Sequence, residues 1–337
     1  MNALVALIVV FLLALIAWVG AGIGLQTIFT LVLPGLALVI FVLGVIARIV
    51  GWARRPVPFK ITTTCGQQKS PLPWIHHSPL DNPYTKLQAF FRMAGEVLLF
   101  RSLFRNTRAA LAGPATDRRL VYGSSKYLWL GAIVFHYSFL VVILHHLQFF
   151  TEPVPGFVVF VEKLDSFFQI GVPTFYITSF TLLAGLGYLL YRRLADAQVR
   201  FMSLLTDYFA LFLLLGIGIT GALLRYTPWR TDITTVKELA LGLWTLTPVT
   251  IHGAHPIFYV HLFLVSVLLA YFPFSKLMHA GGVFLSPTRN MPNDNRAYRH
   301  VNPWADELID NTHTYEEWEE EFADVLKASG YELEHEK

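Results

Sequence analysis

Long apolar runs recur along the chain and indicate its architecture. A run of about 20 apolar residues is long enough to cross the hydrocarbon core of a bilayer as a helix. The sequence predicts six such helices, over residues 3–21, 27–50, 128–150, 170–192, 203–224 and 257–278. Pro34 and Pro273 lie inside two of these runs, where a proline is expected to kink a membrane helix rather than end it. The pattern predicts an all-α, polytopic membrane protein.

The composition supports this fold class. Of the 337 residues, 54% are hydrophobic and only 15% are charged, whereas an average soluble domain carries about 25% charged residues. So few charges could not cover the surface of a soluble protein, which argues against a cytosolic enzyme and a nucleic-acid-binding protein. The first run lacks a basic start and leads directly into the second, so we expect a retained helix rather than a signal peptide.

The distribution of Lys and Arg predicts the orientation of the helices, because these residues favour cytoplasmic loops. Segment 51–127 has 12 Lys or Arg against three acidic residues, and segment 151–169 has one Lys against three acidic residues. We therefore expect a cell (inner) membrane protein whose N- and C-termini are cytoplasmic. The segments predicted to be cytoplasmic include 51–127, 192–202 and the tail; those predicted to face outward are 20–26, 151–169 and 225–256.

Two of the cytoplasmic segments have an amphipathic pattern. In segment 51–127, a proline-rich start favours extended chain, and KLQAFFRMAGEVLLFRSLFRNTRAALAG then shows helical apolar spacing with Arg between. It predicts an amphipathic helix on the membrane surface, a docking surface for a soluble partner, or both. The tail, residues 280–337, has 13 acidic and five basic residues. It predicts a helix capped at Thr314, with Trp318, Phe322 and Leu326 on one apolar stripe.

Five histidines belong to the predicted membrane region, and they carry the strongest chemical signal. They are His136, His145, His146, His261 and His279. Ionisable groups inside a bilayer are costly and suggest function, although a single one is more often an interhelical contact. Imidazole is a common axial ligand of haem iron, and helical bundles build such sites from facing helices. The other seven histidines are expected to be ordinary solvated side chains.

Depth in the membrane pairs these histidines. The third and sixth predicted helices are antiparallel, so His136 lies level with His279 on the inner side and His146 with His261 on the outer side. The helical rise separates His136 from His146 by about 15 Å and His261 from His279 by about 27 Å. His145 competes with His146. Nine residues from His136 turn a helix by about 180°, so the spacing favours His146 and leaves the alternative open.

Several motifs resemble a known family. Tyr122-Gly123, His136-x9-His146 and His261-x17-His279, which includes PFSKLMH, resemble the diheme cytochrome b (gamma) subunit of respiratory nitrate reductase over residues 120–280. The N-terminal hairpin, the proline-rich basic loop and the ending SPTRNMPNDNRAYRHVNPW…HTYEEWEEEF are closer still to the M subunits of DsrMKJOP, a membrane complex associated with dissimilatory sulfite reductase.

The resemblance implies two b haems in a four-helix core. It assigns His136 and His279 to the inner haem and His146 and His261 to the outer haem. It also implies menaquinol or menaquinone as the substrate and a cytoplasmic iron–sulfur (DsrK-like) partner, with DsrJ-, DsrO- and DsrP-like subunits beyond it. The single cysteine, Cys65, excludes a cysteine-ligated cluster and an internal disulfide within this chain itself.

The quinone site is predicted near the outer haem. By resemblance, Lys163 helps to hold the quinone, although an interfacial lysine that snorkels to the surface is an equal alternative. Glu162 and Asp165 are candidate proton acceptors or solvated acids. Arg225 and Arg230 are candidate partners of haem propionates or interfacial anchors. The cluster of Gly216, Gly218 and Gly221 is expected to be a close helix contact rather than a nucleotide site.

The sequence thus predicts four segments: an N-terminal membrane hairpin (1–50), a basic cytoplasmic loop (51–127), a diheme core (128–279) and an acidic cytoplasmic tail (280–337). Two other functions compete. A proton-coupled transporter is disfavoured because the third and sixth predicted helices contain no Asp or Glu and the chain shows no two-fold repeat. A membrane anchor without a cofactor is the second alternative.

Overall fold

The computed structural model describes residues 1–55, 57, 74–114, 116–168, 174–247, 249–251, 253–294, 298 and 313–335. Cys65, His252, His300 and four prolines of the expected extended start (Pro56, Pro58, Pro71 and Pro73) lie outside these residues. Residues 1–49 and 94–283 form one compact unit, and residues 50–93 and 284–337 form a second.

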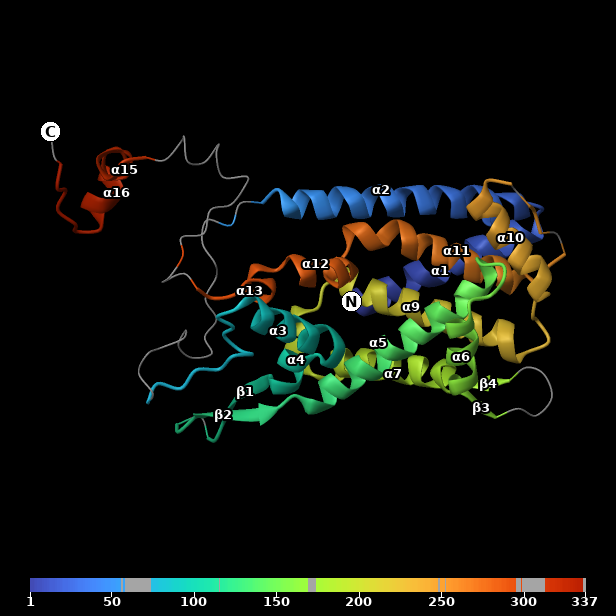
Figure 1. Cartoon of the computed structure of the whole chain (residues 1–337), viewed down its shortest axis with the longest axis horizontal. Helices are drawn as coiled ribbons and strands as arrows, with labels where there is room; N and C mark the ends of the chain where they lie inside the picture. Colours follow the sequence, from blue (N-terminus) through green and yellow to red (C-terminus); the bar gives the residue numbers. More distant parts are fainter. Residues whose placement is uncertain are drawn as a thin grey trace. The chain divides into compact units, whose positions relative to one another are not determined.

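The first unit is built around a helical bundle (Figure 1). Its long helices are α1 (Asn2–Gly22), α2 (Leu33–Ala53), α5 (Lys126–His146), α7 (Ile177–Ala195), α9 (Leu205–Tyr226) and α11 (Pro256–Tyr271). Among the described residues, five helical stretches are long and apolar enough to cross a membrane. The prediction of an all-α polytopic membrane protein is therefore confirmed. The fourth predicted span corresponds to α7, which is not among the five and carries Arg192 and Arg193 in its last turn.

Close packing of α9 and α7 holds the bundle together. α9 packs on α1, α7 and α11, and α5 packs on α7. A Cβ atom on Gly185 of α7 would lie only 3.0 Å from the backbone nitrogen of Phe135, so this glycine lets α5 approach. On α9, a Cβ atom on Gly218 would lie 2.9 Å from Leu183, and one on Gly216 would lie 3.3 Å from Leu264. The expected glycine-rich helix contact is confirmed.

Pro34 and Pro273 have different effects on their predicted helices. The second predicted span continues through Pro34, with one π-helical turn (Ile28–Val32) directly before α2. At Pro273, however, the predicted kink within one helix is wrong, because α11 ends at Tyr271. Two 3-10 turns follow, and Ser275 between them is extended and caps the backbone N–H of Leu277 at 3.2 Å. The chain then starts α12 (His279–Leu285).

The loops gather at two opposite ends of the bundle (Figure 1). One end holds α6 (Gly156–Asp165), β3 (Ser166–Phe168), β4 (Phe175–Tyr176) and α10 (Ile233–Thr245). At the other end, the side-chain amide of Asn2 donates to the Ser203 carbonyl at 3.2 Å, and Lys276 pairs with Asp207 at 2.8 Å. The N-terminus, the segment after α8 (Ala197–Met202) and the end of the last predicted span therefore lie together, as the alternation of basic loops requires.

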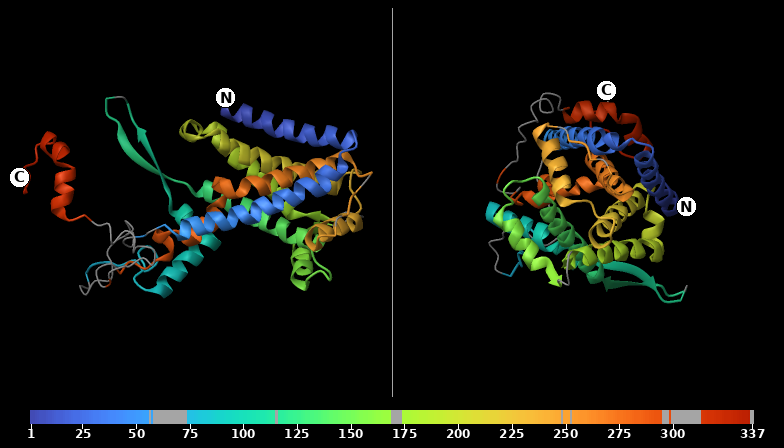
Figure 2. Two further views of the ribbon diagram at one scale, coloured as in Figure 1. Left: turned by 90° about the horizontal axis from the view of Figure 1, so that it is seen from above. Right: turned by 90° about the vertical axis from the view of Figure 1, so that its right-hand side faces the viewer.

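The amphipathic segment forms less helix than predicted. Its helical part is α3 (Lys86–Leu99) and α4 (Arg101–Arg105). The remainder is a hairpin of β1 (Thr107–Ala112) and β2 (Arg119–Ser124), which extends away from the helices in both views of Figure 2. The predicted single helix over 86–113 is wrong beyond Arg105. Gly113, with a φ of +106°, allows the turn that reverses the chain.

The described end of the tail, residues 313–335, contains two short helices where one helix was predicted. α15 (Tyr315–Glu321) starts at Thr314, whose hydroxyl accepts from the backbone N–H of Glu317, so the predicted cap is confirmed. A break at Phe322 separates α15 from α16 (Ala323–Ala328). The buried Glu319 carboxylate accepts from the backbone N–H groups of Glu334 and His335, and these bonds lower the pKa of Glu319. The second unit also includes the short helix α13 (Pro287–Asn290).

Candidate metal centres and the outer polar network

The rings of His136 and His279 lie next to each other in the bundle. His136 comes from the middle of α5, and His279 is the first residue of α12. Their ring centroids are 6.0 Å apart, and the ring planes are inclined by 84°. Two metal–imidazole bonds of about 2 Å each, on opposite sides of one metal ion, would place two ring centroids roughly 6 Å apart. The separation therefore fits two axial ligands of one iron.

The hydrogen bonds of this pair leave the same ring nitrogen available on each side. The Nδ1 of His136 donates to the Ala132 carbonyl at 2.7 Å, and the Nδ1 of His279 donates to the Lys276 carbonyl at 2.7 Å. A carbonyl oxygen can only accept, so in both rings Nδ1 carries the proton. The Nε2 lone pair is then free to bind a metal, which is the usual arrangement of metal-ligating histidine.

The Nδ1 atoms of His146 and His261 are also hydrogen-bonded within the protein. The Nδ1 of His146 donates to the Val142 carbonyl at 2.7 Å. The Nδ1 of His261 lies 2.9 Å from the Thr220 hydroxyl, which itself donates to the Gly216 carbonyl at 2.8 Å and therefore accepts from His261. The two histidines lie close enough to interact electrostatically.

Gly221 makes room for the second imidazole of this outer pair. A Cβ atom at this position of α9 would lie 3.1 Å from Cε1 of His261. Thr220 and Gly221, which are consecutive in the chain, thus orient and accommodate the same ring.

All four predicted ligands therefore present Nε2 while Nδ1 is bonded within the protein. The described residues hold no cluster of three or more His, Cys, Asp or Glu side chains that could bind a bare metal ion. Haem needs no such cluster, because the macrocycle supplies the other iron ligands and the protein supplies only the axial ones. Among the described residues, the donor set fits haem rather than a zinc or calcium site.

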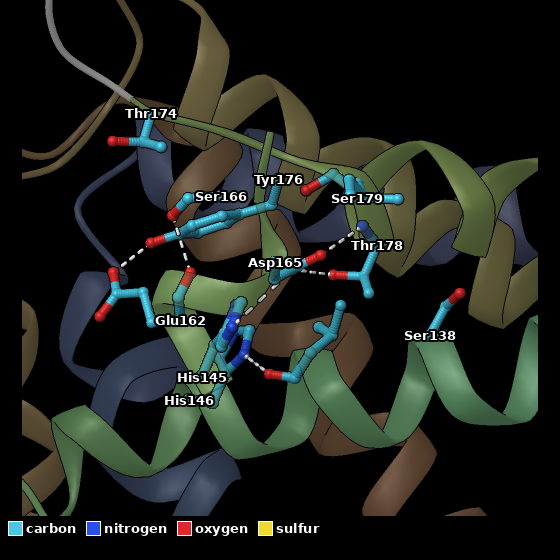
Figure 3. A network of polar contacts seen from close by, with 12 residues as sticks. Ser138, His145, His146, Glu162, Asp165, Ser166, Thr174, Tyr176, Thr178 and Ser179 are labelled. Atoms are coloured by element: carbon cyan, nitrogen blue, oxygen red, sulfur yellow. Dashed lines mark hydrogen bonds and ion pairs between the residues drawn. The ribbon is translucent and has the colours of Figure 1, made fainter. Parts of the chain in front are cut away.

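His145 has different surroundings from His146. It is 7% exposed, and its ring packs 4.6 Å from that of Tyr176. Its Nε2 lies 3.7 Å from a carboxylate oxygen of Asp165, too far for a hydrogen bond. Figure 3 shows His145 facing Asp165. The neighbouring imidazoles thus have different partners, the Asp165 carboxylate for His145 and the Val142 carbonyl for His146.

Asp165 links the outer elements into a polar network (Figure 3). This carboxylate is only 6% exposed and accepts from both the backbone N–H of Thr178, at 2.9 Å, and the Thr178 hydroxyl. It therefore joins the end of α6 to the first turn of α7. Next to it, the Tyr176 hydroxyl donates to Glu162. Asp165 is therefore not the solvated acid that was one of the two expectations, because a buried carboxylate needs hydrogen-bond donors.

Arg225 completes the network from α9. Its guanidinium carbon lies 3.8 Å from the centroid of the Tyr176 ring, and its Nη2 donates to the Thr174 carbonyl at 3.0 Å. Lys163 lies on α6 beside this network and is exposed. Arg230 is exposed as well.

The sequence matches a known family over the region that holds the candidate histidines and the polar network. Residues 93–300 match the family described as nitrate reductase gamma subunit. The chain belongs to this family. It is 48% identical over 284 residues to the "Hdr-like menaquinol oxidoreductase cytochrome b-like subunit" of Archaeoglobus fulgidus, covering 82% of this chain and 83% of that protein. It is 44% identical over 282 residues to the protein of the same description in Archaeoglobus profundus, covering 81% of each chain. The predicted resemblance is confirmed.

Proposed function

We propose that this chain is a diheme cytochrome b subunit that transfers electrons between menaquinol or menaquinone and a cytoplasmic iron–sulfur subunit. The observation that carries the proposal is the shared geometry of His136, His279, His146 and His261, each with Nδ1 bonded and Nε2 available. The names of the two relatives, menaquinol oxidoreductase cytochrome b-like subunits, support quinol-linked electron transfer.

In this proposal, His136 and His279 hold the inner haem, and His146 and His261 hold the outer one. Haem iron supplies one-electron redox chemistry when it is bound. The chain supplies the axial nitrogens, and the backbone carbonyls of Ala132, Val142 and Lys276 orient three of the four rings. A donated Nδ1 proton also makes each imidazole a stronger ligand.

Quinol chemistry is assigned to the outer end. Asp165 and the Glu162–Tyr176 pair are buried or half-buried polar groups beside the outer histidines, and they supply candidate acceptors for the protons that quinol releases. Lys163 holds the quinone carbonyl or a nearby propionate. The support for Lys163 is its place on α6, one residue from Glu162 in this network.

The proposed organisation keeps the four segments 1–50, 51–127, 128–279 and 280–337. The protein is a multi-pass protein of the cell (inner) membrane, with both termini cytoplasmic, which the distribution of Lys and Arg supports. The electron partner is an iron–sulfur subunit of the DsrK type, with DsrJ-, DsrO- and DsrP-like subunits in the same sulfite-reduction-associated complex. One cysteine in 337 residues supports the need for a separate cluster-binding subunit.

The visible spectrum of the purified protein tests the proposal. We expect reduced b-type bands and two haems per chain, measured by pyridine haemochromogen assay against protein concentration. A colourless preparation reconstituted with excess haem would contradict the proposal and leave a transporter or an anchor as the alternatives. Proton-coupled uptake into vesicles by such a colourless protein would then identify the transporter.

Lys163→Ala is expected to slow quinol oxidation by about fivefold, the equivalent of one hydrogen bond of about 1 kcal/mol, while both haem bands remain. The rate is measured with a menaquinol analogue on the purified complex. Lys237→Ala is the matched control, because Lys237 lies on α10 at the same end of the bundle and pairs with Glu152 instead. Equal rates for the wild type and Lys163→Ala would make Lys163 an interfacial anchor.

A further inference from the structure

The junction between α3 and α4 is a single residue with an unusual backbone. Phe100 has a φ of 48° and a ψ of 46°, in the left-handed region. A bulky residue without glycine's freedom adopts this conformation at a cost, because Cβ crowds the following carbonyl. Such a conformation persists only where the surrounding structure holds it. The contacts that hold Phe100, and those that its ring makes, therefore indicate its role.

Hydrogen bonds on both sides of Phe100 hold the junction. The Leu98 carbonyl accepts from the Tyr137 hydroxyl at 2.7 Å, and the Leu99 carbonyl accepts from the Trp129 indole N–H at 2.8 Å. Both donors belong to α5, the helix that carries His136. On the other side, the Glu96 carboxylate spans the junction and accepts from the backbone N–H of Ser102 at 3.0 Å and from its hydroxyl.

The held conformation brings the Phe100 ring to the inner histidine pair. The ring centroid lies 5.0 Å from that of His136, with the planes inclined by 84°. His279 lies 6.0 Å from the same imidazole, also at 84°. His136 thus has Phe100 and His279 as ring neighbours, together with Phe135 from its own helix at 4.7 Å. An aromatic ring in this position restricts rotation of the imidazole and occupies space that water would otherwise fill.

We infer that Phe100 is a positioning residue for the inner haem: the strained α3–α4 junction holds its ring against His136, orients that imidazole and excludes water from it. The inference rests on the proposed function. A ferric haem carries one more positive charge than a ferrous haem, and neutral imidazole ligands do not compensate for that charge. Water stabilises the more charged form, so a dry site favours reduction and raises the potential.

The test is a potentiometric titration of the purified complex with optical detection, accompanied by the low-spin EPR signals of both haems. Phe100→Ala removes the ring, and we expect one haem to shift to lower potential while the other keeps its value. Phe100→Tyr should restore the wild-type potential. Phe104→Ala is the matched control, because the Phe104 ring packs on Trp129 at 4.9 Å rather than on His136, and it should shift neither haem.

Phe100→Gly separates the ring from the backbone strain. Glycine adopts the left-handed conformation without the Cβ clash, so this variant should melt at a higher temperature than Phe100→Ala and still show the same fall in potential. Unchanged potentials and EPR signals in both Phe100→Ala and Phe100→Gly would overturn the inference, as would an equal shift in Phe104→Ala. A wild-type protein without haem would instead contradict the proposed function itself.

Discussion

Alanine in place of His136 or His279 is expected to remove the inner haem and halve the haem content, from two per chain to one. His146→Ala or His261→Ala should likewise remove only the outer haem. In the proposed assignment each pair would supply both protein ligands of its iron, so the remaining histidine alone would not hold the haem. The pyridine haemochromogen assay measures the haem content, and the EPR spectrum shows which low-spin signal is lost.

Two other histidines serve as controls for this experiment. His145→Ala should keep both haems, because His145 faces Asp165 and Tyr176. His255→Ala should also keep both, because the His255 ring stacks on Trp229 at 5.0 Å. A His145→Ala protein that loses a haem, together with a His146→Ala protein that keeps both, would reverse the assignment at the outer end.

Glutamate in place of both Trp318 and Phe322 is expected to weaken co-purification of the iron–sulfur subunit by about tenfold or more, in keeping with buried aromatic anchors at protein interfaces. The two ring centroids lie 5.6 Å apart, and Trp318 and Phe322 are 39% and 40% exposed. The helices α15 and α16 are too short to be stable through helix formation alone. A contact with a partner would bury the two rings, while the acidic residues of the tail steer association. The ratio of the two subunits after affinity purification measures the effect.

Tyr331→Glu is the matched control for the tail, because Tyr331 is an aromatic residue that is 67% exposed and lies beyond the two helices. It should leave the subunit ratio unchanged. Haem spectra of both variants verify that the membrane core is intact. If the doubly substituted protein keeps its partner at the wild-type ratio, docking involves segment 51–127 and the inner helix ends instead.

The positions of the long helices could be predicted from the sequence, because the length and apolarity of a run can be read from it directly. α1, α5 and α9 lie where those runs predict them. The outcome at Pro34 and Pro273 differed because it depends on the neighbours of each proline. Pro273 packs against α2 so closely that a Cβ atom on Gly44 would lie 2.7 Å from it, and this tertiary contact leaves no trace in the local sequence.

The sequence indicated the candidate ligands, but it did not indicate the residues that hydrogen-bond or pack around them. Helical rise paired His136 with His279 and His146 with His261 by depth, and it left His145 as an alternative to His146. The resemblance to the family supplied the choice, which stays a prediction. The helical estimates of about 15 Å and 27 Å assume regular helices, and α11 is not regular up to His279. Thr220, Tyr176 and Thr178 were not predicted, since their partners are distant in sequence and their residue types are common in membrane helices.

The interruption after Tyr271 places the proposed ligands His261 and His279 on two separate helical elements. His261 belongs to α11, whereas His279 begins the short helix α12 beyond two 3-10 turns. A tilt of α11 would therefore not reach His279 through one continuous helix.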